Sequence, residues 1–381
     1  MKALLKNFLF TRLYLRQMNF KRDLRLLVIF TFLSPYCFGQ TAGEYYERGI
    51  RELYKNKNYK AALTAFSRVI DIDPEFYAAY TNRGKVKQKM RDYYGARKDF
   101  DKAVELRPQS FDVYIARADF NTAIKKLNEA YEDYTRALDL NPGSTEIYTK
   151  RAQVAHLLRD FNSGIQDLDS AISITPADHK LYAMRAHIKS NAYDSRSDTG
   201  VEWGKAAIVD LDTALSIDPL NADYYDQRGV IKFELGRNLD AMADFNRAIE
   251  LNPKNPETFN NRGLVKMKIE DYKSANSDFG KAIELSPDKE YYFRNRGLTR
   301  FNAGKYKMAI TDYTRAIQLI ISQGEVPADG VNFKLTNAHL IRGMSYVAIK
   351  NNFAGCKDFY RAAELGETKA KNYLRRYCNN Q

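Results

Sequence analysis

Four histidines and three cysteines are the side chains of this 381-residue chain best suited to binding a metal or acting as nucleophiles. No histidine is accompanied by a cysteine or a close-set acidic group at metal-ligand spacing, so the pattern favours ordinary surface histidines over a zinc site. The sequence also contains no Gly-rich phosphate loop and no nucleophile elbow. We therefore expect no catalytic residues, no bound metal and no cofactor. The four histidines are His156, His179, His187 and His339.

Two of the cysteines, Cys356 and Cys378, lie close together near the C-terminus. An even pair of cysteines is compatible with a disulfide if the chain is exported to an oxidising compartment. Cys378 ends a short amphipathic segment, Lys369 to Tyr377, that we expect to cap the C-terminal end of the fold. Two buried free thiols are an equally good interpretation, and the sequence leaves both open.

Arginine and aspartate recur in step along most of the chain. Each arginine precedes a glycine or alanine, and each aspartate directly precedes an aromatic residue or a leucine. Arginine suits paired, partly buried positions because its flat guanidinium matches a carboxylate. We therefore favour a ladder of Arg–Asp pairs that ties helices together, over independent solvated charges. The residues are Arg83, Arg117, Arg151, Arg185, Arg228, Arg262, Arg296 and Arg342, with Asp99, Asp133, Asp167, Asp210, Asp244, Asp278, Asp312 and Asp358.

The elements that carry these residues recur with a fixed period. Small residues and rings repeat at spacings of three and four, which places them on one helix face. Glycine inside a helix costs about 1 kcal/mol relative to alanine, so its recurrence after the arginines indicates tight contact with a second helix. A constant period of this length is typical of stacked two-helix repeats. Intervals of 34 residues, with one of 43, separate Pro74, Pro108, Pro142, Pro176, Pro219, Pro253 and Pro287.

This pattern resembles the tetratricopeptide repeat family. The match consists of an aromatic at the fourth place, Gly or Ala at the eighth, Ala at the twentieth, a ring at the twenty-fourth, Ala at the twenty-seventh and Pro at the thirty-second. It covers roughly residues 43–365. The resemblance implies an all-α, right-handed superhelical solenoid of helix-turn-helix repeats with a C-terminal capping helix. We place repeats one to eight at 41–323, an inserted linker at 324–335, repeat nine at 336–365 and the cap at 366–381.

The first repeat departs from the family pattern, since Gly49 lies one place off and Ala65 stands where later repeats have aspartate. Two insertions also break the period, one near Asn191 to Trp203 and one from Ser322 to Phe333. Insertions in solenoids form loops and often lie on binding faces. Simple growth of a tolerated loop is the alternative for both.

The resemblance also implies a concave groove that is lined by first helices and binds a protein or peptide. In some members, asparagine at the sixth repeat position hydrogen-bonds the backbone of an extended peptide. Asn82, Asn261 and Asn295 hold that position here, and other residues interrupt the series between Asn82 and Asn261. Amide side chains would satisfy the peptide's donors and acceptors. The predicted groove residues are Asn82, Lys85, Lys150, Asn261 and Asn295.

The first 40 residues differ in character from the repeats. Basic residues precede an apolar run from Leu26 to Leu33, and small residues follow it. This is the pattern of an export signal, and the run is too short to span a membrane comfortably. We expect a signal peptide at 1–40, cleaved after Gly39 or Gln40, with Met18 as an alternative start. The expected location is the periplasm or cell envelope of a bacterium, with no stable transmembrane span after cleavage.

The charge pattern bears on the choice of partner. Residues 1–40 carry seven Lys or Arg and one Asp, so they hold six of the net +13 and leave +7 for the repeats. Those charges are interspersed without a basic block, which argues against a nucleic-acid partner. The sequence thus favours a non-catalytic scaffold or adaptor. The alternative is a regulatory or substrate-recruiting subunit of an enzyme complex whose catalytic chain is separate.

Overall fold

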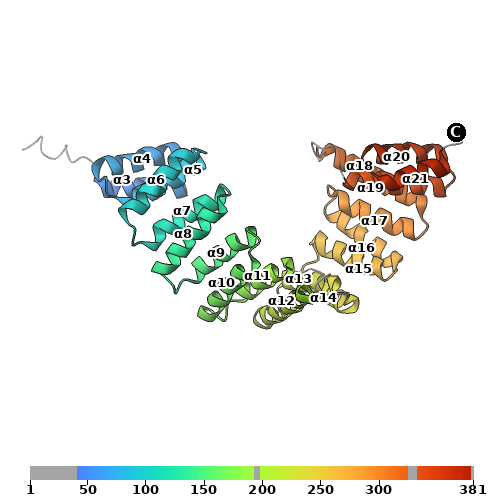
Figure 1. Cartoon of the computed structure of the whole chain (residues 1–381), viewed down its shortest axis with the longest axis horizontal. Helices are drawn as coiled ribbons and strands as arrows, with labels where there is room; N and C mark the ends of the chain where they lie inside the picture. The colour runs from blue at the N-terminus through green and yellow to red at the C-terminus, as the bar shows by residue number, and fades with distance from the viewer. Residues whose placement is uncertain (1–40, 193–197, 325–332, 379–381) are drawn as a thin grey trace, which may run out of the picture. The chain divides into compact units, whose positions relative to one another are not determined.

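The structure, a computed structural model, describes residues 41–192, 198–324 and 333–378. Every element in these ranges is a helix, as the fold prediction requires. The chain divides into two compact units, Met1–Leu140 and Asn141–Gln381, called unit 1 and unit 2 below (Figure 1). The predicted export signal and most of the predicted linker lie outside the described residues. None of the described helices combines the length and apolar character that crossing a bilayer requires.

Unit 1 contains repeats one to three. In each repeat the first helix packs against the second, and the second packs against the first helix of the next repeat. The elements are α3 (Ala42–Ile50), the π-helix η1 (Arg51–Lys55), α4 (Tyr59–Ile72), α5 (Tyr77–Lys89), α6 (Tyr93–Leu106), α7 (Phe111–Ala123) and α8 (Leu127–Leu140).

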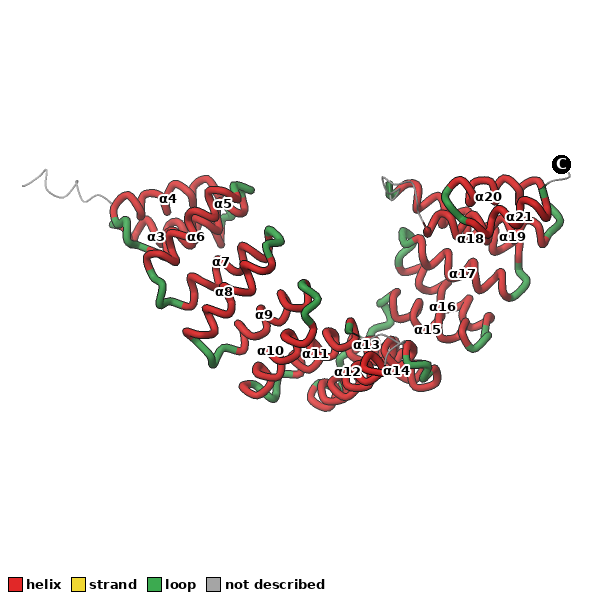
Figure 2. Tube along the Cα trace, viewed as in Figure 1, coloured by secondary structure: helices red, strands yellow, loops and turns green. Residues whose placement is uncertain are grey.

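Unit 2 contains repeats four to nine and the cap, and its helices pack in the same order (Figure 2). The predicted cap is present as a helix packed on the last repeat. The elements are α9 (Thr145–Leu157), α10 (Phe161–Ile174), α11 (His179–Asn191), α12 (Asp198–Ile217), α13 (Ala222–Glu234), α14 (Asn238–Leu251), α15 (Pro256–Lys268), α16 (Tyr272–Leu285), α17 (Glu290–Asn302), α18 (Tyr306–Ser322), α19 (Phe333–Ala348), α20 (Asn352–Glu364) and α21 (Thr368–Tyr377).

The two helices of a repeat approach closely because glycine faces a ring. A Cβ atom added at Gly263 would lie 2.9 Å from the ring of Phe279, and one added at Gly343 would lie 2.7 Å from the ring of Phe359. Such distances are shorter than ordinary van der Waals contact, so a larger side chain would push the helices apart. The cost of a helical glycine is therefore offset by close packing against a fully buried ring.

The π-helix η1 explains why Gly49 lies one place out of register. Gly49 and Phe66 are separated by one residue more than Gly84 and Phe100, yet both glycines face their rings. A π-turn accommodates one extra residue within a helix. The widened turn in η1 returns the chain to register, so the first repeat keeps the same core contact as its neighbours.

The insertion in repeat five lengthens a helix as well as a loop. Helix α12 begins at Asp198 and has 20 residues, whereas α14 and α16 have 14 each. Trp203, in the added part of α12, packs against the core cluster of repeat four that includes Ile165 and Leu168. The single tryptophan is therefore used for packing between repeats.

Candidate partner-binding surface

The predicted Arg–Asp ladder is confirmed in all eight repeats that carry both residues. In repeat two, Arg83 Nε and Nη2 donate to the two carboxylate oxygens of Asp99 at 2.9 and 2.8 Å. Asp99 is only 3% exposed, so this pair lies inside the helix hairpin. The other pairs are Arg117–Asp133, Arg151–Asp167, Arg185–Asp210, Arg228–Asp244, Arg262–Asp278, Arg296–Asp312 and Arg342–Asp358.

Each ladder arginine also makes contacts beyond its aspartate. Arg262 Nη1 donates to Asn246 of the preceding repeat at 2.8 Å, and its guanidinium lies 5.7 Å from the ring centre of Phe259. The Nζ atom of Lys266, one helical turn later, lies 2.7 Å from Oδ2 of Asp278. Two cations and one carboxylate are thus held together between the helices. Because the ladder residues bond to one another, they are structural and offer few hydrogen-bonding groups to a partner protein.

Two of the ladder carboxylates, Asp358 and Asp167, have pKa values shifted in opposite directions. Burial alone would raise the pKa of Asp358, but hydrogen bonds from Arg342 and His339 outweigh it and lower that pKa below its usual value. Burial raises the pKa of Asp167, and Arg151 offsets only part of the increase. Repeat four has Ala155 where repeats two, five, six and seven have lysine, so Asp167 lacks the second cation that those repeats supply.

The expectation of surface histidines is wrong for His339. This residue is 8% exposed, and its Nδ1 lies 2.8 Å from a carboxylate oxygen of Asp358, so it joins the ladder as a second hydrogen-bond partner of that aspartate. His156 and His187, from adjacent repeats, have ring centres 5.3 Å apart. Burial, and then repulsion from His187, lower the pKa of His156. Across the described ranges, no three His, Cys, Asp or Glu residues gather in an arrangement suited to a metal ion.

The predicted groove residues fall into two environments. In unit 1, Asn82 is 7% exposed and donates to Tyr46 at 2.9 Å and to the carbonyl of Ala78 at 3.0 Å, so its amide serves the packing of repeats one and two. Lys85 is half-buried on the same helix. In unit 2, Lys150 Nζ lies 3.2 Å from Glu146, one turn earlier in α9.

The structure brings Asn261 and Asn295 into one hydrogen-bonded chain that crosses repeats six to eight. Asn295 Nδ2 donates to Asn260 at 2.8 Å, Asn260 Nδ2 donates to Asn261 at 3.4 Å, and Asn261 Nδ2 donates to Asp226 at 3.4 Å. Burial raises the pKa of Asp226, and hydrogen bonds from Thr258 and Asn261 offset only part of the increase. The register of the repeats places Asn260 beside Asn261 in the predicted groove, whereas Asp226 was not among the predicted site residues.

Two tyrosines and a glutamate form a second hydrogen-bonded group one helical turn earlier on helices α15 and α17. Tyr291 and Tyr292 both donate to Glu257, the latter at 2.7 Å. We call Asp226, Glu257, Asn260, Asn261, Tyr291 and Asn295 the polar seam. It runs over the first helices α13, α15 and α17, which contact one another. The seam offers carbonyl, amide, phenol and carboxylate groups along one line, and such groups suit an extended backbone.

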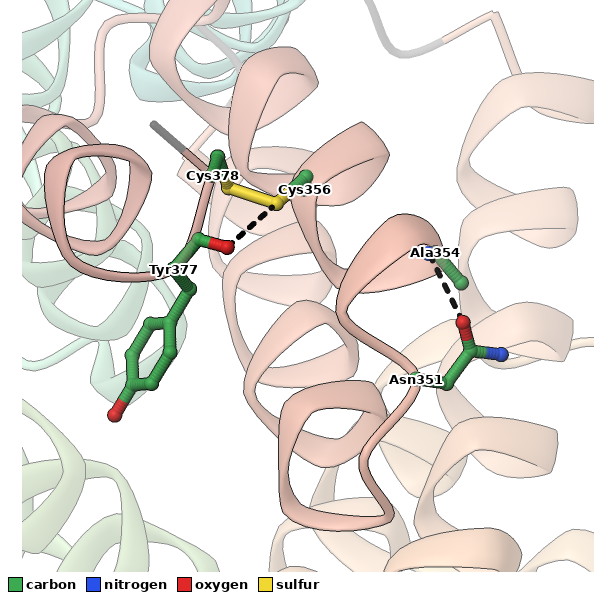
Figure 3. Close-up of a disulfide and its surroundings, with 5 residues drawn as sticks. All are labelled: Asn351, Ala354, Cys356, Tyr377 and Cys378. Carbon is green, nitrogen blue, oxygen red and sulfur yellow. Dashed lines mark hydrogen bonds between the residues drawn. A yellow bond between two sulfur atoms is a disulfide. The ribbon is translucent and has the colours of Figure 1, made fainter. Parts of the chain in front are cut away.

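At the C-terminal end, Cys356 of α20 and Cys378 after α21 form a disulfide (Figure 3). Asn351 caps α20 by accepting from the backbone NH of Ala354 at 3.2 Å. The bond lies in a core cluster with Phe359 and Ala370, so it fixes the cap helix onto the last repeat. Of the two open interpretations, the structure contains the bonded one.

Comparison with known proteins agrees with this architecture. Residues 229–270 match the model of the TPR repeat, and residues 77–110, 111–144 and 256–289 match that of the tetratricopeptide repeat. No curated protein matches the chain with significant sequence similarity.

Two solved structures are similar in fold. The C-terminal part of a TPR repeat-containing protein from Cytophaga hutchinsonii has 20% identity and a TM-score of 0.52, with 68% of this chain and 98% of that chain covered. A tetratricopeptide repeat protein from Parabacteroides merdae has 20% identity and a TM-score of 0.50, with 68% and 99% covered. Together with the helix pairs and the glycine–ring contacts, these matches show that the chain contains tetratricopeptide repeats and folds as a solenoid of that type.

Proposed function

We propose that the protein is a non-catalytic adaptor of the bacterial cell envelope that binds an extended segment of a partner protein along the polar seam of repeats six to eight. The observation that carries the proposal is the chain of side-chain amides from Asn295 to Asp226. Each amide has two NH donors and a carbonyl with two lone pairs, so the half-buried Asn261 and Asn295 keep capacity for a ligand beyond their internal hydrogen bonds. A peptide backbone supplies the matching donors and acceptors.

The proposal separates the two halves of the predicted groove. The amide of Asn82 is enclosed by Tyr46 and its own helix, so we assign it to packing rather than to the partner. Asn261 and Asn295 are half-buried and keep contact with the surface. The partner-contacting residues are therefore assigned to the half-buried side chains of the polar seam, whereas Asn260, only 5% exposed, positions its neighbours. Lys150 and Lys85 lie outside the seam.

Site-specific photo-crosslinking tests this assignment in the native envelope. A photoreactive side chain at position 261 or 295 should capture one discrete partner, because both positions face the same line of the seam. Control positions are the exposed Glu284 of α16 and Lys307 of α18, on second helices of the same repeats. Equal capture from Glu284 and Lys307 would reject the seam. Whether the captured chain has catalytic activity distinguishes an adaptor from the subunit of an enzyme complex.

A further inference from the structure

The tips of the helix hairpins in unit 1 carry cations at a backbone position that disfavours them. Lys57, Arg91 and Lys125 hold equivalent places between the first and second helices of repeats one to three, with φ of 53°, 64° and 61°. A left-handed conformation costs a residue with a Cβ about 1 kcal/mol, and glycine avoids this cost. Repeats six and eight have Gly236 and Gly304 at the same place. Unit 1 therefore has basic side chains where the backbone favours glycine.

Other exposed cations surround these tips. Lys55, Lys89 and Lys98 are exposed on the flanking helical turns, and Lys98 lies 4.6 Å from the ring centre of Tyr94. Within residues 41–140, no carboxylate lies within ion-pair distance of the side chains at 57, 89, 91 and 125. Two nearby acids have other partners, since Asp92 caps α6 and Glu129 binds Arg97 and Lys126. Within residues 41–140, the four cations at the tips therefore have no ion-pair partner.

Successive hairpins stack in one orientation, with α5 packed against both α4 and α7, so their tips lie along the same edge of unit 1 (Figure 2). Exposed tyrosines are interleaved with the cations on this edge, Tyr54 at 58% and Tyr94 at 73% exposure. We call the cations at 55, 57, 89, 91, 98 and 125, with Tyr54, Tyr93 and Tyr94, the tip edge. Near the opposite edge of unit 1, by contrast, the exposed acids Asp71, Glu105 and Asp139 are each paired with a cation three residues earlier.

We infer that the tip edge binds an anionic membrane surface. Protruding turns fit a flat surface better than a peptide, which needs a groove. Lysine and arginine attract anionic headgroups, and tyrosine is favoured at the headgroup level. We choose a lipid surface as the source of the anionic groups because the proposed function places the protein in the cell envelope. The tip edge shares no residue with the polar seam.

The test measures binding of the full chain to vesicles of phosphatidylcholine with and without phosphatidylglycerol. The triple variant Lys57→Gly, Arg91→Gly, Lys125→Gly removes three cations and also relieves the left-handed strain, so its Tm should not fall. Each cation near an anionic surface contributes about a factor of five to ten, so binding to anionic vesicles should weaken on the order of a hundredfold. Binding of the unaltered chain should also weaken as salt rises.

The matched control is Arg68→Gln, Lys102→Gln, Arg136→Gln, which removes the same charge from second helices near the opposite edge. Each of these cations already has an acidic partner three residues later, so anionic vesicle binding should change little. Equal loss in both triple variants, or no loss in the glycine variant, would overturn the inference.

Tighter binding to a single-stranded oligonucleotide than to vesicles at the same salt would also overturn it, because nucleic acid would then be the favoured ligand of the tip edge. Asn295→Ala should leave vesicle binding unchanged, which separates this test from that of the seam.

Discussion

Repeat one and repeat seven form the same helix hairpin with different interiors. Both place a glycine against a fully buried phenylalanine, Gly49 against Phe66 and Gly263 against Phe279. Repeat seven adds a buried aspartate with two cations, whereas repeat one has Ala65 at that place and needs the π-turn of η1 to keep register. The apolar contact is thus sufficient to form a hairpin. The charged cluster adds a link to the preceding repeat, from Arg262 to Asn246.

Breaking the cluster in repeat seven should have the largest effect. Asp278→Ala leaves Arg262 and Lys266 side by side without a carboxylate, and removing one partner of a buried pair is strongly destabilising. We expect a loss of about 3 kcal/mol in the free energy of unfolding, measured by denaturant titration. The converse change in repeat one, Ala65→Asp, should also destabilise, because it buries a carboxylate that no ladder arginine meets. An Asp278→Ala variant as stable as the parent would show that the cluster is dispensable.

The next effect concerns the two ends of the chain. Repeat nine has the ladder and also a disulfide to its cap, whereas repeat one has neither. Replacing Cys356 and Cys378 by alanine should lower stability by about 2–4 kcal/mol, chiefly by freeing α21. Hydrogen exchange should then become faster in α21 than in the helices of repeat seven.

In the parent protein, thiol labelling after unfolding without reductant should find both cysteines blocked. Labelling of both cysteines would contradict the disulfide.

Acidic pH should distinguish Asp358, whose hydrogen bonds outweigh the effect of burial, from Asp167, whose hydrogen bonds do not. The folded pKa of Asp358 is lowered, so its contribution to stability is present above the ordinary carboxyl pKa and is lost as pH falls through the folded value. The folded pKa of Asp167 is raised, so its ionisation opposes folding as pH rises from the ordinary carboxyl value through the folded one. At neutral pH, Asp358→Asn should therefore lower the Tm more than Asp167→Asn. Equal effects in a pH series of Tm measurements would refute the role given to His339.

The smallest effects are those of single ladder pairs and seam amides. A double-mutant cycle between Arg262 and Asp278 should give a coupling energy of at least about 0.5 kcal/mol, and strictly additive effects would favour independent charges.

Asn295→Ala breaks its hydrogen bond to Asn260 and should cost about 1 kcal/mol of stability. With a partner in hand, Asn261→Ala together with Asn295→Ala should weaken binding by about 1–3 kcal/mol. Unchanged affinity would move the partner off the seam.

Much of the fold could be read from the chain because each repeat is built from local spacings. The distance between Gly84 and Phe100, and that between Arg83 and Asp99, recur in later repeats, and helical geometry converts such spacings into contacts. The residues of the candidate site were harder to predict from the sequence. Asn82 and Asn295 share a repeat position, yet one amide is enclosed by Tyr46 and the other joins the seam. The difference arises from the preceding first helix, which the repeat pattern does not specify.

By itself, then, the sequence determined the period, the helix pairs, the Arg–Asp pairing and the cap, since these follow from residues close together in one repeat. Only the tertiary structure decided that a π-turn restores the register of repeat one and that His339 and Lys266 contact ladder aspartates. It also decided which asparagine amides are exposed enough to bind a partner. It also gathers Lys57, Arg91 and Lys125 along one edge, although the sequence shows only interspersed charge. The physical reason is stacking, which places side chains one period apart next to one another.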